Sequence, residues 1–363
     1  MTKLHSLKVK LPSGVEQITI GNNIAGDKWL SEFVAGYDKR IIVVDARFAA
    51  LHPGQFKQLT EALMPDEIIQ FEVTLKLKCY DTIKQLSDRM VEANAGRKSC
   101  IIAVGGGTLG DTAGFFASIF MRGIDYVQIP TTLMSMADAI IGKVAIDHGD
   151  HKNLFGAYMS PRLVICDVAL LRGLPPRQLA EGMVEIWKHS ILIGDIKRQA
   201  QISDFSRSQP TDLLADLVEF SLRIKKSFVE ADHTETRGVH VALSLGHTLS
   251  NYLEKRYGVT HGQGVLVGIT HAVLLSKQAG IITEGYSRSL LDTALVIDRE
   301  LDILSRFTSD LDSPDLFRYL HSDKINHHGE LFFVVPTGKG YAVRSFTPDQ
   351  IIEAYATIRT ITQ

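Results

Sequence analysis

Apolar and polar residues alternate with a period of two at the start of the chain, over residues 7–11 and 15–20. Pro12, Ser13 and Gly14 separate these two runs, a composition typical of a tight turn. The pattern therefore predicts that the chain opens with a β-hairpin.

Short apolar runs follow the hairpin and are separated by a segment with helical spacing. The run at residues 41–45 ends in an acid and is typical of a buried parallel strand. Residues 79–94 carry apolar side chains at helical spacing, and a glycine follows closely at position 96. Further strands are predicted at residues 99–104, 126–129 and 163–167. Strands that alternate with helices indicate a mostly parallel sheet that binds ligands at the carboxyl ends of its strands.

The pattern changes after Leu174-Pro175-Pro176. Helical spacing dominates from there, and no strand pattern returns before residues 331–335, with a candidate partner at 342–346. A chain of 363 residues also exceeds what one hydrophobic core usually serves. We therefore predict an α/β domain over residues 1–174 and a mainly helical domain over residues 175–363. The predicted helices of the second domain cover residues 178–193, 211–230, 248–257 and 264–277.

Composition excludes several classes of protein. The formal net charge is −2 and no five like charges are consecutive, which argues against a nucleic-acid or membrane-surface partner. The three cysteines form no CxxC pair and no disulfide framework. Without an apolar stretch of 18 residues or a hydrophobic signal core, a cytoplasmic location is expected.

The first candidate site is the glycine triplet that follows the strand predicted at 99–104. Glycines at 105, 106 and 107 have no Cβ, so the backbone can turn tightly and approach a ligand closely. The helix that is predicted to follow would present unpaired N–H groups, which suit a diphosphate. The spacing is not that of GxGxxG, so a plain tight turn remains an equal alternative for this feature.

The second candidate site lies in the helical half. Glu185 falls within a predicted helix, and His247 and His261 each precede one. One carboxylate and two imidazoles leave a coordination position open, as in a catalytic zinc site. The spacing matches no local zinc motif, so the alternative that each histidine caps a helix or lies in a satisfied polar pocket stays open.

Eight motifs, in this order, resemble those of the sugar-phosphate cyclases, the superfamily typified by 3-dehydroquinate synthase. They are Gly-Gly-Gly-Thr-Leu-Gly-Asp at 105–111, Met-Arg-Gly at 121–123, Ile-Pro-Thr-Thr-Leu at 129–133, Lys-Asn-Leu-Phe-Gly-Ala at 152–157, Leu-Pro-Pro-Arg at 174–177, Glu-Ile-Trp-Lys at 185–188, Gly-His-Thr at 246–248 and His-Gly at 261–262. The resemblance extends from about residue 41 to residue 335.

This resemblance implies an NAD-binding α/β domain, a helical metal- and substrate-binding domain, a site between them and a homodimer. The implied cofactors are NAD and a divalent metal, Zn or Co, and the metal ligands would be Glu185, His247 and His261. The implied cofactor-binding residues are Asp45, Lys78, Gly105, Gly106, Gly107, Asp111, Thr131, Thr132 and Lys152. The implied catalytic and substrate residues are Arg122, Asp138, Lys143, Asn153, Lys188, Lys226, His240 and Ser244. Arg122 would reach the substrate phosphate, from the neighbouring subunit in a dimer.

The implied reaction on a sugar-phosphate partner is alcohol oxidation by NAD, phosphate elimination, re-reduction and aldol ring closure to a carbocycle. The protein must then supply a hydride carrier, a Lewis acid and cationic phosphate ligands. Other interpretations are that Arg122 and Lys152 are solvated surface charges, and that Lys188 is an ion-pair partner of Glu185 three residues away.

Several positions depart from the 3-dehydroquinate synthase pattern. His240 stands where the family has an arginine that pairs with the substrate carboxylate, and imidazole lacks the bidentate, permanently charged guanidinium. Ser244 replaces an asparagine and Asn251 a histidine, and the segment from Asp138 to Lys143 is one residue shorter. A lysine that also serves the carboxylate matches either Lys225 or Lys226.

We therefore expect a carbon–oxygen lyase of this superfamily with an altered substrate pocket, acting on a sugar phosphate without a carboxylate in cyclitol biosynthesis. Three alternatives remain: an authentic 3-dehydroquinate synthase, a metal-dependent polyol or glycerol-phosphate dehydrogenase that releases NADH, and a non-catalytic relative.

Overall fold

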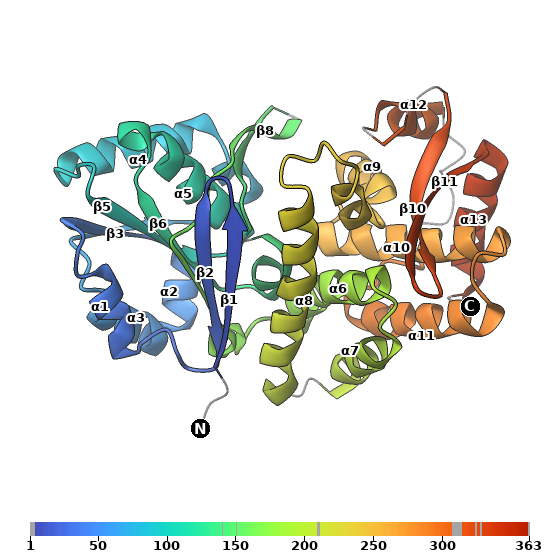
Figure 1. Ribbon diagram of the computed structural model, residues 1–363, viewed down its shortest axis with the longest axis horizontal. Helices are drawn as coiled ribbons and strands as arrows, with labels where there is room; N and C mark the ends of the chain where they lie inside the picture. Colours follow the sequence, from blue (N-terminus) through green and yellow to red (C-terminus); the bar gives the residue numbers. More distant parts are fainter. Residues whose placement is uncertain are drawn as a thin grey trace. The chain divides into compact units, whose positions relative to one another are not determined.

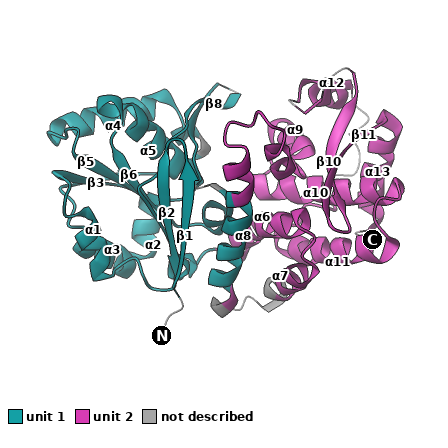
Figure 2. Ribbon diagram, viewed as in Figure 1, with its two compact units in different colours: residues 1–174, 214–226 teal, residues 175–213, 227–363 magenta. Residues whose placement is uncertain are grey.

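The computed structural model of the protein describes residues 4–139, 141–149, 151–208, 211–306, 314–323, 325–326 and 329–361. Contacts between Cα atoms divide the chain into two compact units (Figure 2). Unit 1 holds residues 1–174 and 214–226, and unit 2 holds residues 175–213 and 227–363. The segment 214–226 groups with unit 1, although the sequence pattern assigned it to the second domain.

Unit 1 is built on a seven-stranded sheet. Its strands, in spatial order, are β1 (His5–Leu11), β2 (Gly14–Gly21), β9 (Leu163–Asp167), β6 (Asp125–Pro130), β5 (Ser99–Gly105), β3 (Lys39–Asp45) and β4 (Glu67–Phe71). Strands β1 and β2 are antiparallel. All other neighbouring strands of the sheet, in the spatial order β2, β9, β6, β5, β3 and β4, are parallel. The predicted hairpin, strands and α/β class are confirmed, while β4 was not predicted.

Helices cover both faces of this sheet (Figure 1). On one face, α1 (Lys28–Val34), α2 (Ala46–Leu51) and α3 (Pro53–Leu63) pack against Ile42 and Val44 of β3. On the other, α4 (Tyr80–Glu92) and α5 (Gly107–Ile119) pack against Ile41 and Val43 of the same strand. Successive side chains of a strand point to opposite faces of the sheet. A strand in a sheet that helices cover on both faces therefore requires an unbroken run of apolar residues.

A second, two-stranded sheet in unit 1 was not predicted. It pairs β7 (Val144–His148) with β8 (His151–Ala157) in antiparallel fashion. The side chains of β8 are exposed from residue 151 to 156. No hydrophobic alternation marks such a strand, which explains why the sequence pattern missed it.

Unit 2 is mainly helical, which confirms the predicted fold class. Its helices are α6 (Pro176–Leu192), α7 (Ile196–Ser208), α9 (His247–Tyr257), α10 (His261–Gln278), α11 (Glu284–Leu301), α12 (Pro314–Ser322) and α13 (Pro348–Ile361). Helix α8 (Thr211–Ala231) contributes its central residues to unit 1. The expected strands appear as the hairpin of β10 (Leu331–Thr337) and β11 (Gly340–Phe346).

Helix α10 is the core of unit 2. Every side chain from Gly262 to Ser276 is buried, and the helix contacts α6, α9, α11 and α13. A Cβ added at Gly262 would lie 2.6 Å from the Cα of Glu181 on α6. The absent side chain thus lets two helix backbones approach closely, which brings the first turn of α10 against α6.

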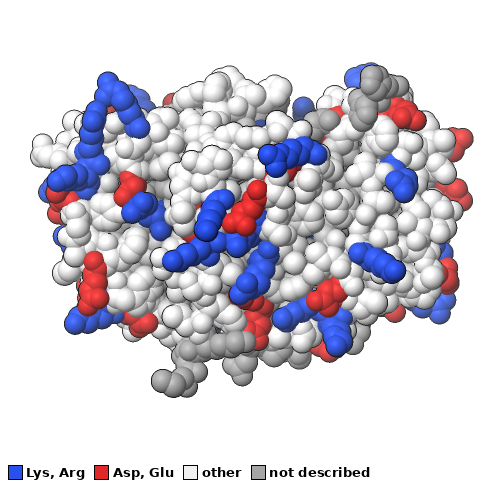
Figure 3. Space-filling view, in the orientation of Figure 1, with Lys and Arg blue, Asp and Glu red and all other residues white. Residues whose placement is uncertain are grey.

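The surface carries charges of both signs. On the face shown in Figure 3, Lys and Arg side chains are interspersed with Asp and Glu. Among the described residues, no helix has the length and apolar character needed to cross a membrane.

Candidate functional site

The candidate nucleotide site of unit 1 lies where the order of the strands reverses. From β3 the chain forms β4 on one side, and then crosses to form β5 on the other side of β3. In parallel sheets, ligands bind outside the carboxyl ends of the strands at such a switch point. Asp45 ends β3 and Gly105 ends β5, and Val44 of β3 is paired with Val104 of β5. Asp45 and the glycine turn therefore flank the crevice that this topology creates.

The glycine turn joins β5 directly to α5. Gly106 is the N-cap of α5 and has an extended backbone, with φ −74° and ψ −178°. A Cβ on Gly106 would lie 3.2 Å from Cγ2 of Thr132, and one on Gly105 would lie 3.1 Å from the side chain of Leu109. Glycine is therefore favoured at positions 105 and 106 because a Cβ would be crowded by neighbouring side chains. The backbone conformation is not the reason, since neither residue has a positive φ. The N-terminus of α5 is left open to a polar ligand.

Asp45 also has a local structural role. Its carboxylate caps α2 by accepting a hydrogen bond of 2.9 Å from the backbone N–H of Arg47. Partial burial raises the pKa of Asp45, and the hydrogen bond and charge of Arg47 oppose that rise. The hydrogen bond to Arg47 thus holds the carboxylate in one orientation at the end of β3.

Lys78 brings together residues from three elements. Its Nζ lies 2.6 Å from Oδ2 of Asp111 on α5 and also donates to Oδ1 of Asn153 on β8. Asn153 has a positive φ of 54°, and its N–H donates to Asp147 at 2.6 Å. Burial raises the pKa of Asp111, while the Lys78 ammonium lowers it. The structure thus assembles three of the predicted residues, far apart in the chain, into one polar cluster.

Asp138 lies in a π-helical turn (Ser135–Ala139), an irregularity frequent at functional sites. Its Oδ1 forms an ion pair of 3.3 Å with Nζ of Lys225 on α8. The sequence leaves Lys225 and Lys226 as alternatives for the lysine that serves a substrate carboxylate, with Lys226 given that role. The structure pairs Lys225 with Asp138, and the role of Lys226 stays a prediction.

A buried acid that the sequence analysis missed lies close to this segment. Glu16 of β2 is fully buried, and its Oε1 accepts a hydrogen bond of 2.7 Å from the N–H of Gly142. Burial raises the pKa of Glu16 to about 8, against the opposing effects of Gly142, Ser160 and Lys225. Glu16 therefore anchors the segment that leads to Lys143.

The candidate metal site lies in unit 2. Glu185 on α6, His247 at the start of α9 and His261 at the start of α10 offer ligand atoms that lie within 4.8 Å of one another. Oε1 of Glu185 is 3.5 Å from Nε2 of His261 and 3.8 Å from Nε2 of His247. Two tetrahedral ligands of zinc, each at about 2.0–2.1 Å from the metal, are separated by about 3.3 Å. The three side chains therefore need only small movements to bind one cation.

The hydrogen bonds of the two imidazoles fit a metal site. Nδ1 of His247 lies 3.2 Å from the carbonyl oxygen of Leu245, and Nδ1 of His261 lies 2.9 Å from Oε1 of Glu254. Both partners accept hydrogen bonds, so each histidine carries a proton on Nδ1. Nε2 of each histidine faces Glu185 and is the nitrogen that a metal would bind in place of a proton, as in metal-bound histidines whose second nitrogen donates to a carboxylate or carbonyl.

Several charged side chains are buried together at this position. Glu185 is fully buried, and Lys188, 1% exposed, places Nζ 2.5 Å from its Oε2. Burial alone would raise the pKa of Glu185, but Lys188 and the two imidazoles outweigh burial and hold it well below its usual range. Burial lowers the pKa of His261, yet Glu185 and Glu254 outweigh that effect and raise it to about 10. The site thus stabilises positive charge beside Glu185.

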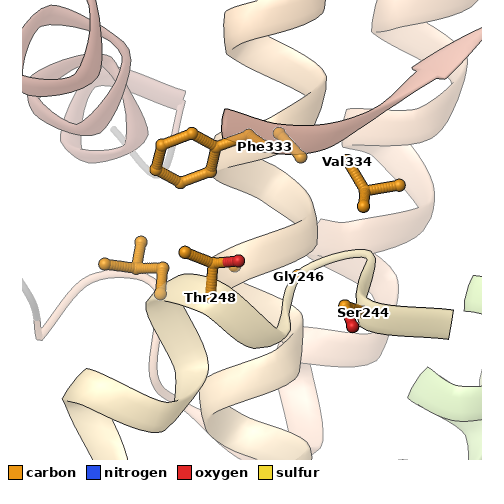
Figure 4. A pocket seen from close by; sticks show the side chains of 8 residues that line it. Ser244, Gly246, Thr248, Phe333 and Val334 are labelled. Atoms are coloured by element: carbon orange, nitrogen blue, oxygen red, sulfur yellow. The ribbon is translucent and has the colours of Figure 1, made fainter. Parts of the chain in front are cut away.

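A glycine turn sets the position of His247. Gly246, the N-cap of α9, has a positive φ of 80°, and a Cβ there would lie 2.7 Å from Ile269 of α10. In Figure 4, Ser244 and Gly246 precede the first turn of α9, and Thr248 faces Phe333 and Val334 of β10. These five residues help to line one small pocket. Ser244 therefore lines a small pocket together with Thr248 and Phe333.

His240 is held in a compact loop. The buried carboxylate of Asp232 accepts four backbone hydrogen bonds, of 2.9 to 3.2 Å, from residues 236, 237, 239 and 240. Nε2 of His240 lies 3.4 Å from Oε1 of Glu235, whose φ is +58°. Glu235, an acid of the same loop, therefore lies beside the imidazole of His240.

The remaining predicted residues are distributed over unit 1. Thr131 is buried and donates its N–H to the carbonyl of Gly105 at 3.0 Å. Arg122 is exposed and has a positive φ of 73°, an uncommon conformation that recurs at functional sites. Lys152 is exposed on β8, and Lys143 is half-buried.

Two protein families match consecutive segments of the chain. Residues 68–181 match the family described as 3-dehydroquinate synthase N-terminal, and residues 182–326 match 3-dehydroquinate synthase C-terminal. The 3-dehydroquinate synthase of Alkaliphilus metalliredigens is 31% identical over 352 residues, covering 93% of this chain and 94% of that protein.

Two solved structures share the fold. One is 2-epi-5-epi-valiolone synthase from Streptomyces hygroscopicus subsp. jinggangensis with NAD+ and Zn2+ bound, with a TM-score of 0.81, 24% identity and coverage of 94% and 96% of the two chains. The other is 2-deoxy-scyllo-inosose synthase complexed with carbaglucose-6-phosphate, NAD+ and Co2+, with a TM-score of 0.80, 23% identity and coverage of 97% and 99%.

Proposed function

Because the chain belongs to the 3-dehydroquinate synthase family, we propose that it is an NAD- and metal-dependent sugar-phosphate cyclase. The observation that carries this proposal is the convergence of Glu185, His247 and His261, with both imidazoles directing Nε2 toward the carboxylate. Three ligands with an open position suit a metal that binds substrate.

Glu185, His247 and His261 would hold Zn2+ or Co2+, the ions bound in the two structural neighbours. When bound, the metal would polarise a substrate hydroxyl or carbonyl oxygen, and NAD would take up and return a hydride. Lys188 places a buried ammonium beside the ligand carboxylate, where it can orient or protonate substrate oxygen.

In unit 1, the open N-terminus of α5 and the carboxylate of Asp45 would bind the dinucleotide. Lys78 would hold Asp111 and Asn153 in place for the nicotinamide and substrate. Arg122 and Lys152, both exposed, would bind the substrate phosphate and stabilise it as it leaves. We further propose a homodimer in which Arg122 reaches the neighbouring subunit.

The proposed substrate is a sugar phosphate without a carboxylate. Its support is the pairing of His240 with Glu235, because an acid 3.4 Å from the imidazole repels a second carboxylate. Ser244, which lines a small pocket with Thr248 and Phe333, is a neutral residue. The alternative of an authentic 3-dehydroquinate synthase is supported by the relative that is 31% identical over 93% of the chain.

The test combines two readouts in one reaction. Purified protein is incubated with NAD+, Zn2+ or Co2+, and either sedoheptulose 7-phosphate, glucose 6-phosphate or the 3-deoxy-heptulosonate phosphate acid. Release of phosphate without accumulation of NADH is expected for a cyclase. NADH without phosphate would instead identify a polyol or glycerol-phosphate dehydrogenase. Turnover of only the acid would replace the altered-pocket proposal by 3-dehydroquinate synthase activity.

A further inference from the structure

We propose that Glu254 is a positioning residue that holds His261 ready to bind the metal. This inference rests on the metal site of the proposed function. Glu254 lies two turns after His247 on α9, and its side chain is 6% exposed. Its Oε1 is 2.9 Å from Nδ1 of His261. Helix α9 thus supplies the candidate ligand His247 and also Glu254, the hydrogen-bond partner of the candidate ligand His261.

The orientation of Glu254 is itself constrained. Ser250, one turn earlier on α9 and fully buried, donates its hydroxyl to the same Oε1 at 2.9 Å. A Cβ on Gly264 of α10 would overlap Oγ of Ser250. The missing side chain on α10 therefore makes room for the hydroxyl that orients the carboxylate.

The acceptor decides which nitrogen of His261 can bind a metal. An ionised carboxylate only accepts hydrogen bonds, so Nδ1 of His261 carries a proton, and Nε2, which faces Glu185, is the nitrogen left to bind a metal. His247 obtains the same tautomer from the carbonyl of Leu245. Only His261 receives a negative charge with its hydrogen bond, which increases electron density at Nε2.

Charge gives Glu254 a second role. The ammonium of Lys188 offsets the charge of Glu185 within the buried site. Glu254 adds one further negative charge behind His261. When His261 is neutral, as a metal ligand must be, Glu185, Lys188 and Glu254 together carry a net charge of −1 that attracts a cation. An uncharged residue at position 254 would leave them neutral, and we therefore expect weaker metal binding.

The test measures metal affinity instead of turnover. Zn2+ and Co2+ are titrated into metal-free protein in competition with a chelator, and the visible absorption of bound Co2+ is recorded. Glu254→Gln keeps the shape of the side chain and removes its charge, and we expect 10- to 100-fold weaker binding and an altered Co2+ spectrum. Ser250→Ala should show a smaller loss. The matched control is Glu284→Gln, an exposed acid on α11 paired with Lys277, which should bind metal like the wild type.

The outcomes separate this inference from the proposed function. Wild-type affinity and spectrum in Glu254→Gln would overturn the role of Glu254 and leave the metal site standing. A wild-type protein that binds neither ion would overturn the metal site and the role of Glu254 together. If Glu254→Gln does not fold, as judged by circular dichroism, Ser250→Ala decides, and metal affinity equal to wild type would overturn the inference.

Discussion

Gly246 and Gly268 lie so close together that a Cβ on Gly268 would overlap the carbonyl oxygen of Gly246. The turn before α9 therefore rests directly on the backbone of α10. This contact sets the first residue of α9, His247, beside the first residue of α10, His261, whose ring centroid is 5.2 Å away. Backbone packing thus brings two candidate ligands together.

Gly268→Ala should consequently disturb both the stability and the metal site. The added methyl group meets backbone atoms that cannot rotate away, and we expect a loss of about 1–3 kcal/mol. Urea unfolding and metal titration provide the measurements. Gly285→Ala on α11 is the control because a Cβ there meets no atom within 4 Å, and it should be neutral or stabilising. Equal stability of the two variants would contradict this account.

Lys78→Met should weaken NAD binding and reduce stability. The change removes the ammonium shared by Asp111 and Asn153 and leaves a largely buried carboxylate without that partner, at a cost of about 1–3 kcal/mol. Calorimetric titration with NAD+ and urea unfolding measure the two effects. In the control Lys84→Met, the lost pair with Asp88 is exposed, so the stability should change by less than about 0.5 kcal/mol and NAD binding not at all.

Lys188→Met should destabilise the metal-free protein far more than the metal-loaded protein. Without the ammonium, the buried carboxylate of Glu185 loses its cationic neighbour, which costs about 3 kcal/mol or more. A bound divalent cation supplies the missing positive charge. The increase in melting temperature on adding Zn2+ should therefore be larger in this variant than in the wild type. An equal increase in both proteins would argue against a cation beside Glu185.

The free energy of unfolding should fall as the pH rises because Glu16 loses its proton. Its pKa is about 8 in the folded state and 4.5 as a model value, so between these pH values the folded protein binds the extra proton. The contribution of Glu16 to the free energy of unfolding is therefore greatest below about pH 4.5 and is lost as the pH rises to about 8, by up to about 5 kcal/mol. Glu16→Gln removes this dependence, and urea unfolding at pH 5, 7 and 9 compares the two slopes. Parallel pH profiles would show that Glu16 is ionised in the folded protein.

The local pattern of residues determined most of the elements. The strands at 41–45, 99–104, 126–129 and 163–167 and the helices near α6, α8, α9 and α10 were predicted because neighbouring residues carry their periodicity. The types of the candidate ligands, an acid and two histidines, could also be read from the chain. The exposed strand β8 could not, because it has no buried face to mark it.

Tertiary structure decided which side chains meet. Lys225 and Lys226 are equivalent in sequence, but adjacent residues of a helix point about 100° apart, and the packing of α8 directs Lys225 toward Asp138. Glu254 belongs to no local motif, and its hydrogen bond with His261 depends on how α9 packs against α10. The sequence by itself therefore determined the elements and the chemistry available, because both reside in neighbouring residues. The close packing of helices through glycines 246, 262, 264 and 268 decided the geometry, because it joins residues that are distant in the chain.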